Sequence, residues 1–290
     1  MPWTETTRRE YRRETPRYAS DLTDYEWDLI ARFMPPRRTV GRPRKTNLRE
    51  VMNAILYIGS TGCQWAMLPK DFPPYSTVQR YFYDWRDSGL LQTMRFMLAM
   101  ETRELEGRDA QPTAGVIDSQ SVKTTESGGM RGYDAGKKIN GRKRHIVVDT
   151  IGLLFGAVVH TADVQDRDGA PDVLASIRKS CPWLRHIFAP SRRMRAFACR
   201  ATDGGYAGPK LRGALDRIGE WTLQIVKRSD AAQGFEVIPR RWVVERTFAW
   251  LGRCRRLAKD WEKSIASAEA WIDIAHIRLT TRRLARYCYV

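Results

Sequence analysis

The sequence predicts an α/β domain with a mixed sheet, preceded by a smaller all-helical domain. Up to about Arg108, apolar residues recur at helical spacing between Pro and Gly stops. Beyond Arg108, short runs rich in Val, Ile and Phe alternate with helical stretches, the order expected when helices cover a sheet. We therefore expect a mobile arm of alternating Arg and Glu at 1–20, the helical domain at 21–108, and the α/β domain with C-terminal helices at 109–290.

The net charge is the most informative property of the composition. The 290 residues contain 50 Lys and Arg against 33 Asp and Glu, a net charge of +17 with a pI near 10.0. This excess predicts a polyanionic partner, and nucleic acid fits better than a membrane surface because no lysine-rich amphipathic helix backed by Trp or Leu is visible in the sequence. Apolar runs are far shorter than the roughly 20 residues of a membrane span, and the N-terminus does not resemble a signal peptide. The five cysteines contain no CxxC pair, so we expect a protein of the reducing cytoplasm.

The helical domain begins with a short helix and a basic segment. Apolar residues at 25–33 have helical spacing after an Asp or Thr cap, and the pattern stops at a Pro-Pro pair. Residues 37–45 then carry five basic side chains, including Arg42 and Arg44, around a Gly-Arg-Pro core. The proline makes this core extended, so the segment is either a contact to the DNA minor groove or a solvated linker.

Two further helices separated by a tight corner predict a helix-turn-helix. An apolar helix starts near Leu48, a turn-rich stretch covers 63–75, and the next helix is capped by Ser76. On that last helix Gln79 and Arg80 point outward, where a DNA-reading helix needs hydrogen-bond donors. The alternative interpretation is a helical hairpin that only packs on the next domain.

The α/β domain is predicted from five strand-like runs and the helical stretches between and after them. The runs are AGVIDSQ (114–120), RHIVVDT (144–150), LLFGAVVHTA (153–162), LRHIFA (184–189) and WTLQIVKR (221–228). The helical stretches are 168–182, 208–219 and a long one from about Pro239 to Lys259. The turn Asp149 to Gly152 joins two of the strands as an antiparallel hairpin, which makes the sheet mixed.

Three acids from distant parts of the chain are candidates for a metal site. Asp118 ends the first strand, and Asp203 opens DGGYAG between the fourth strand and the next helix. Strand ends at one edge of an α/β sheet are where ligands commonly bind. Glu245 lies about 100° around its helix from the buried Val244, so it can face the sheet. Three carboxylates brought within a few ångströms of one another would repel unless a divalent cation is bound. The arrangement therefore predicts a magnesium site.

Each acid also has a purely structural interpretation. Asp118 can cap a turn, Asp203 can cap a helix or a turn, and Glu245 can pair with Arg241 on the same helix face. Other acids compete with them, with one in the hairpin turn and three in a loop before a helix N-terminus: Asp149, Asp163, Asp166 and Asp168.

Four stretches resemble, nearly word for word, bacterial insertion-sequence transposases of the insertion-sequence-five family. They are VIDSQSVKT (116–124), GYDAGKKINGRKRHIVVDTIGLL (132–154), DGGYAG (203–208) and RRWVVERTFAWLGRCRRLAKDWE (240–262). The similarity runs from about Leu22, through TGCQWAMLP in the helical part, to the C-terminal region. It implies a DDE enzyme with an RNase H-like fold whose catalytic acids fall on Asp118, Asp203 and Glu245, the last preceded by Arg241.

The chain departs from these relatives at two places. In them HIFA runs directly into DGGYAG, whereas here residues 190–202 lie between the two motifs. The extra residues either form a basic loop that leaves Ala189 at the strand end, or replace the end of the strand and move Asp203. The second departure is Ile238, where some related transposases have a Tyr three residues before the helix Arg.

The resemblance implies two Mg2+ ions, for which Mn2+ can substitute, that serve hydrolysis at the element ends and then direct transesterification into target DNA. The implied partners are the terminal inverted repeats and the target DNA, with at least a homodimer and a bacterial, nucleoid-associated location. A non-catalytic derivative that acts as a DNA-binding repressor is the main alternative, and a simple nuclease is a third. The sequence does not specify the repeat, the target, second-strand processing or the number of subunits.

Basic residues near the acids are predicted to hold DNA phosphates. Seven basic residues lie between Lys123 and Arg144 against two acids, and more follow Glu245. A solvated face is the alternative for any such charge run, and GRKRH entering a strand is the strongest candidate for phosphate contact. Outside the helical domain the candidates are Lys123, Arg142, Lys143, Arg144, Arg241, Arg253, Arg255 and Arg256.

Overall fold

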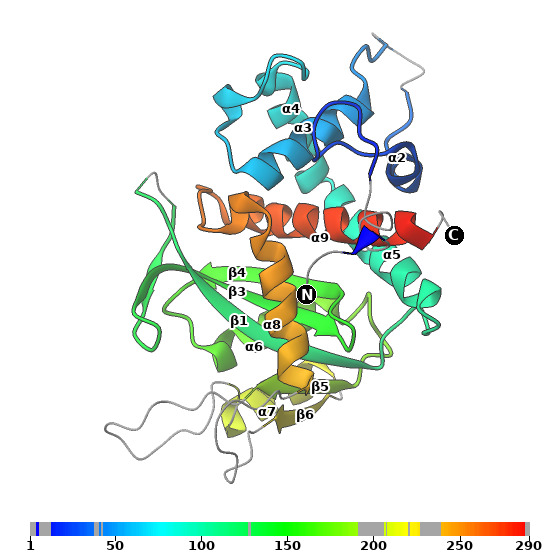
Figure 1. Ribbon diagram of the computed structural model, residues 1–290. Coiled ribbons are helices and arrows are strands. Elements are labelled where there is room, and N and C mark those ends of the chain that lie inside the picture. Colours follow the sequence, from blue (N-terminus) through cyan, green and yellow to red (C-terminus); the bar gives the residue numbers. More distant parts are fainter. Residues whose placement is uncertain are drawn as a thin grey trace. The chain divides into compact units, whose positions relative to one another are not determined.

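The computed structural model describes residues 4–5, 13–37, 41, 43–126, 129–190, 206, 208–219, 221–226 and 239–287. The chain divides into two compact units (Figure 1). Unit 1 contains residues 1–107, 253–257 and 270–290, and unit 2 contains residues 108–252 and 258–269. The C-terminal stretch from 270 therefore belongs with the helical unit, which differs from the predicted boundary of 109–290 for the second domain.

Unit 1 is helical. Its elements are α2 (Asp24–Ala31), α3 (Leu48–Thr61), η1 (Trp65–Met67), α4 (Tyr75–Asp87), α5 (Leu90–Leu105), η2 (Arg255–Leu257) and most of α9 (Ile265–Tyr287). The predicted cap of α2 is confirmed, because Thr23 and Glu26 form a reciprocal capping box. The predicted Ser76 cap is wrong, since α4 begins at Tyr75 after Pro74 and Ser76 lies inside the helix. The proline already fixes the entry of the chain into that helix.

Aromatic packing explains why α9 belongs to unit 1. The Trp271 ring of α9 stacks on Phe82 at 4.8 Å between centroids and lies 5.9 Å from Trp65. Gly59 of α3 lies beside this ring, and a Cβ there would be in ordinary van der Waals contact with it at 3.5 Å. A buried ion pair, Arg95 Nε to Asp273 Oδ1 at 2.7 Å, joins α5 to α9. The last helix is thus part of the core of this unit.

Residues 13–20 are packed rather than free, which differs from the mobile arm predicted for 1–20. Arg13 pairs with Glu26, and the Tyr18 ring stacks on Phe72 with centroids 5.3 Å apart. The Tyr18 hydroxyl also donates to Asp71 at 2.7 Å. The prediction was wrong for this part of the arm because the contacts come from residues far along the chain. The remaining arm residues, except 4–5, lie outside the described part.

Unit 2 has a mixed sheet with helices, as predicted. Its elements are β1 (Ala114–Lys123), β2 (Gly132–Asp134), β3 (Ile139–Asp149), β4 (Leu154–Thr161), α6 (Asp166–Ile177), β5 (His186–Pro190), α7 (Pro209–Ile218), β6 (Thr222–Val226) and α8 (Pro239–Gly252). The strand order is β2-β3-β1-β5-β6, with β4 paired to β3. β1 is antiparallel to β3 and parallel to β5, and the hairpin between β3 and β4 is confirmed. The short strand β2 was not predicted, and α8 ends at Gly252 rather than near Lys259.

The side chains of β1 alternate between the two faces of the sheet. Asp118 and Gln120 face α8, which crosses the sheet (Figure 1), whereas Ser119 contacts Asp166 at the start of α6. The α6 helix packs closely on the face of the sheet opposite α8, since a Cβ at Gly156 of β4 would lie 2.6 Å from Ile177. The two faces of β1 therefore serve different helices.

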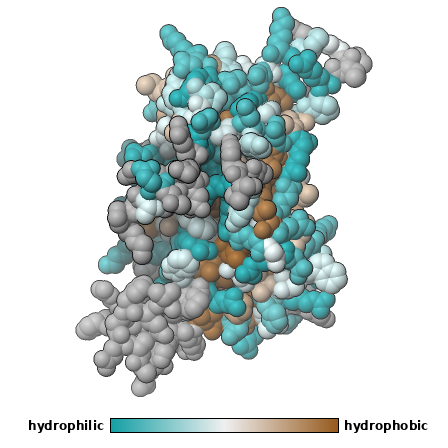
Figure 2. Space-filling model, turned by 45° about the vertical axis from the view of Figure 1, so that its right-hand side comes forward, coloured by the Kyte–Doolittle hydropathy of each residue, from teal (hydrophilic) through white to brown (hydrophobic). Residues whose placement is uncertain are grey.

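Hydrophilic side chains dominate the face of the molecule shown in Figure 2, in keeping with the charge of the chain. Among the helices that the structure describes, none is both long and apolar enough to cross a membrane.

Candidate active site

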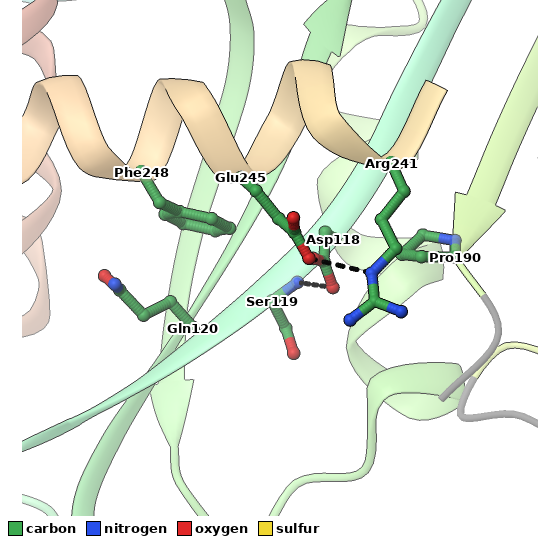
Figure 3. A pocket seen from close by; sticks show the side chains of 7 residues that line it. All are labelled: Asp118, Ser119, Gln120, Pro190, Arg241, Glu245 and Phe248. Carbon is green, nitrogen blue, oxygen red and sulfur yellow. Dashed lines mark hydrogen bonds and ion pairs between the residues drawn. The ribbon is translucent and has the colours of Figure 1, made fainter. Parts of the chain in front are cut away.

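Asp118 and Glu245 lie in one pocket of unit 2. The pocket has a volume of about 270 Å3 and is lined by Asp118, Ser119, Gln120, Pro190, Arg241, Glu245 and Phe248. Figure 3 shows the two carboxyl groups directed toward the same space, one from β1 and the other from α8. The structure therefore brings together two of the three acids that the sequence singled out.

The position of Asp118 follows from strand register. The prediction that Asp118 ends the first strand was wrong, because β1 continues to Lys123 and Asp118 lies in its middle. Val116 and Ile117 before it are fully buried, and Asp118 is only 8% exposed. Its Oδ1 accepts the Ser119 backbone N–H at 2.7 Å. In the parallel pairing of β1 and β5, Val116 lies opposite Phe188, so two residues further along each strand come Asp118 and Pro190. The end of β5 thus reaches the wall of the pocket.

Glu245 both lines the pocket and pairs with Arg241, the two interpretations that the sequence left open. Val244, Phe248 and Leu251 are buried, and the Glu245 side chain next to this stripe is 50% exposed. Arg241, one turn earlier, donates from Nε to Glu245 Oε1 at 2.7 Å (Figure 3). The ion pair and the pocket position therefore coexist. Because both side chains are exposed to a large extent, the pair contributes little stability by itself.

Asp203 lies outside the described residues, as do its neighbours from 191 to 205. The described chain reaches Pro190 at the pocket wall and resumes with Tyr206. No group of three His, Cys, Asp or Glu side chains suited to a metal ion occurs within the described ranges. The two carboxylates present nonetheless fit a hard divalent cation, which prefers oxygen ligands and would offset their mutual repulsion. A third ligand at Asp203 remains a prediction.

Behind Asp118, a network of buried charged and polar side chains joins β1, β2, β3 and α6. Lys143 Nζ lies 3.4 Å from Asp134 and 3.3 Å from Asp166, and Ser119 Oγ donates to Asp166 at 2.6 Å. Ser121 Oγ donates to Asp134 at 2.6 Å. Burial raises the pKa of Asp134, but the hydrogen bond from Ser121 and the nearby lysines outweigh it and hold the pKa below its usual value. Asp166 and Asp168 lie in the first turn of α6 and not in the loop before it, because the helix begins two residues earlier than predicted. Lys143 here serves the fold.

Comparison with known proteins identifies the family. A model described as Transposase DDE domain matches residues 109–279. The chain belongs to this family. A second model, described as Putative transposase of IS4/5 family, matches residues 22–95. The DDE family region therefore includes both Asp118 and Glu245.

Two curated relatives match parts of the chain. Uncharacterized protein y4sN of Sinorhizobium fredii is 34% identical over 80 residues, which are 28% of this chain and 64% of that protein. A protein of Burkholderia cepacia, described as Putative transposase for insertion sequence element IS402, is 32% identical over 124 residues, 42% of this chain and 54% of the relative. The chain thus spans between half and two thirds of the length of these relatives. No solved structure matches it.

The GRKRH stretch of the DDE region does not present the basic surface that the sequence predicted. Arg142, Lys143 and Arg144 are at most 5% exposed. Arg142 pairs with Asp260 at 3.1 Å and donates to the Met130 and Lys263 carbonyls. Burial lowers the pKa of Arg144 to about 10. The prediction of phosphate contacts is wrong for these three residues as placed here, because alternation in a strand covered on both faces buries them all.

The other predicted DNA contacts fall into three groups. Lys123, Arg80, Arg253 and Arg255 are exposed. Three other side chains are partly or fully covered and donate hydrogen bonds within the protein. Arg256 donates to the Cys63 carbonyl. Gln79 donates to the Tyr83 hydroxyl, and Arg44 donates to the Pro35 carbonyl. Arg42 lies outside the described residues. Residues 253–257 belong to unit 1 and not to the helix of Glu245, because α8 ends at Gly252.

Within the part of the chain that the structure describes, no histidine lines the pocket of the DDE region. His145 is fully covered in unit 2, and burial lowers its pKa to about 3. His276 of unit 1 is equally buried, and its pKa also falls to about 3. Both rings are therefore neutral near pH 7, as expected for structural residues.

Proposed function

We propose that this chain is a DNA transposase whose catalytic acids are Asp118, Asp203 and Glu245. The observation that carries the proposal is the shared pocket of Asp118 and Glu245, two acids 127 positions apart in sequence number that come from a strand and a helix of the DDE region. The family membership supports transposase chemistry and favours it over an inactive, DNA-binding derivative. The mixed sheet is consistent with the RNase H-like fold that DDE domains imply.

Divalent cations, when bound, would supply the charge that activates water or a DNA 3′-hydroxyl and stabilises the leaving oxygen, with Mg2+ as the proposed metal and Mn2+ as a substitute. Asp118 and Glu245 are the residues proposed to hold them, together with Asp203. Asp118 is held in place by its strand and by the Ser119 N–H. Glu245 is half exposed and is free to turn toward a ligand without unfolding its helix.

Arg241 has a proposed role in binding DNA beside these acids. Its guanidinium neutralises Glu245 in the described arrangement. When Glu245 binds a cation, the guanidinium becomes available to a phosphate at the mouth of the pocket, where it can donate two parallel hydrogen bonds. We further propose that Lys123, Arg253, Arg255, Arg42 and Arg44 contact phosphates, and that α4 with Gln79 and Arg80 is the reading helix of a helix-turn-helix. Element ends and target DNA are the proposed substrates, held by a homodimer or larger assembly.

A strand-transfer assay tests this function. The protein is incubated with a labelled terminal-repeat duplex, a target plasmid and MgCl2, and labelled DNA joined to the plasmid is expected. The Asp118→Ala variant is expected to lose joining, whereas Asp216→Ala, an exposed acid on α7, is expected to retain it. Bound but uncut DNA would indicate a repressor, and cut but unjoined DNA a nuclease. Joined product that persists in Asp118→Ala would overturn the site.

A further inference from the structure

We infer that Thr247 is a positioning residue which, with Arg246, fixes the axial position of α8 so that Glu245 faces Asp118. The two residues dock α8 on the turn between β3 and β4, residues 149–153, hereafter the 149–153 turn. This inference rests on the proposed function of Asp118 and Glu245, and it assigns a role to side chains that do not touch the pocket.

The apolar stripe of α8 cannot by itself set the position of Glu245 along the helix axis. Val244, Phe248 and Leu251 turn the correct face toward the sheet, but apolar contacts are not directional. A slide of one residue moves a side chain by about 1.5 Å along the axis. A metal site requires metal–ligand distances that are correct to within a few tenths of an ångström. Directional contacts are therefore needed to fix the axial position.

Thr247 and Arg246 supply such contacts. Thr247 is fully buried, and its Oγ1 lies 2.9 Å from the Gly152 carbonyl oxygen of the 149–153 turn and 3.1 Å from the Val243 carbonyl oxygen of its own helix. Arg246 Nη2 donates to the Ile151 carbonyl at 2.8 Å. Two adjacent residues of α8 thus bind two adjacent carbonyls of the turn, immediately after Glu245.

The 149–153 turn is held by its own hydrogen bonds and continues from β3, which pairs with the strand that carries Asp118. The buried Asp149 carboxylate accepts the backbone N–H groups of Ile151 at 3.0 Å and Leu153 at 2.8 Å. Asp149 itself pairs with Gly115 of β1, three residues before Asp118. The position of Asp118 is therefore transmitted through β3 and the turn to the helix that carries Glu245.

Gly152 permits the close approach of helix and turn. Its φ is +88°, a conformation that favours glycine. A Cβ there would lie 2.8 Å from Thr247 Oγ1 and 3.4 Å from both an Arg246 nitrogen and the Trp250 ring. Any side chain at this position would push α8 away from the turn.

Arg246 is also fixed from the helix side. Its guanidinium carbon lies 4.5 Å from the ring centroids of both Trp242 and Trp250, one turn before and one turn after it. Stacking between two rings restricts the guanidinium to the plane from which it reaches the Ile151 carbonyl. The side chain is therefore committed to holding α8, and a phosphate would have to displace these contacts.

Three threonine variants test the inference. Thr247→Val keeps the shape but removes the hydroxyl, Thr247→Ser keeps the hydroxyl, and Thr281→Val is the matched control. Thr281 is likewise fully buried in a helix, but its hydroxyl donates to Ile277 of its own helix in unit 1. Binding of Mn2+ is measured by the loss of the free-ion electron paramagnetic resonance signal, beside the melting temperature and the kcat and KM of strand transfer.

Thr247→Val is expected to raise the Kd for Mn2+ about tenfold and to lower kcat with little change in KM for DNA. Thr247→Ser is expected to stay within about twofold of wild type, and Thr281→Val to lose stability without a change in Mn2+ binding. As a second test, Gly152→Ala is expected to raise the Kd for Mn2+ and to lower kcat to the same extent as Thr247→Val. Gly89→Ala serves as its control, since Gly89 also has positive φ, at +74°, but has open space around it.

The outcomes separate this inference from the proposed function. Wild-type Mn2+ affinity in both Thr247→Val and Gly152→Ala would overturn the positioning role alone, provided that Asp118→Asn weakens binding. Mn2+ binding that is absent in the wild type, or unchanged in Asp118→Asn, would overturn the proposed metal site and the positioning role with it.

Discussion

Replacement of Arg142 by Met should destabilise unit 2 without acting through DNA. The Arg142 side chain is fully buried and makes three hydrogen bonds, to Asp260 Oδ1 at 3.1 Å, to the Met130 carbonyl at 3.0 Å and to the Lys263 carbonyl at 2.9 Å. Methionine fills much of the volume but leaves Asp260, which is 2% exposed, without its main cation. Removal of one partner of a buried ion pair costs about 3–5 kcal/mol.

This loss corresponds to a large fall in melting temperature. In a domain of this size each kcal/mol lowers the melting temperature by about 2–4 °C, so the Arg142→Met variant should melt about 10 °C lower. The double variant Arg142→Met, Asp260→Leu should recover most of the loss, because a well-packed apolar pair often replaces a buried ion pair at little cost. Thermal unfolding followed by circular dichroism measures both variants.

Lys123→Ala provides the contrast on DNA. Lys123 is exposed at the end of β1, so its loss should leave the melting temperature within about 1 °C of wild type. It should reduce the slope of log affinity against log salt by about 1, the effect of one lost phosphate contact. Wild-type stability of Arg142→Met together with a reduced salt slope would refute the structural assignment of Arg142 and restore the sequence prediction.

Three further predictions concern stability. Thr23→Ala should cost about 1 kcal/mol through loss of the α2 capping box, whereas Ser76→Ala should change the free energy of unfolding by less than about 0.5 kcal/mol; urea titration of both variants checks this. Gly141→Ala should destabilise the protein by about 1–3 kcal/mol, because its Cβ would lie 2.0 Å from the Val122 carbonyl oxygen. Gly213→Ala on α7 should instead stabilise it by up to about 1 kcal/mol, because a Cβ there meets no atom within 4 Å. Thermal melts of both variants check this. Burial and neighbouring arginines hold the pKa of His276 near 3, so its contribution to stability is present above about pH 6.5 and is lost as the pH falls from there toward 3. At pH 5 this loss is about 2 kcal/mol, and His276→Gln should show a smaller difference between urea midpoints at pH 7 and pH 5 than wild type.

Local patterns predicted the parts of the site that depend on local structure. Asp118 was found because an acid follows two β-branched residues of a buried strand, although the strand continues to Lys123 instead of ending there. Glu245 was found from its angle to the apolar stripe on a helix. The hairpin turn at Asp149 to Gly152 was also predicted, since turn residues between two strand-like runs require it. Each of these features depends on neighbours within one turn or one strand.

Features that depend on distant partners were not predictable from local patterns. The stretch at 142–144 was assigned to the surface from its charge, whereas Asp260 and the carbonyls of a segment more than a hundred residues away make it part of the interior. Likewise α9 joins the helical unit through Trp271 and Asp273, whose partners Phe82 and Arg95 lie in the first third of the chain. The docking of Thr247 on the 149–153 turn was missed for the same reason. Gly152 in that turn indicates that another part of the chain comes close to the backbone there, but the sequence does not show which part.

Cleavage of the protein backbone by bound iron tests most directly the claim that Asp118, Asp203 and Glu245 meet at one divalent-cation site. Fe2+ replaces Mg2+ in the protein, and ascorbate with hydrogen peroxide then generates radicals that cut the chain beside the metal. We predict cuts near residues 118, 203 and 245 that excess Mg2+ suppresses and that disappear together in Asp118→Asn. Cuts confined to other segments, or a pattern that is unchanged in Asp118→Asn, would contradict the account.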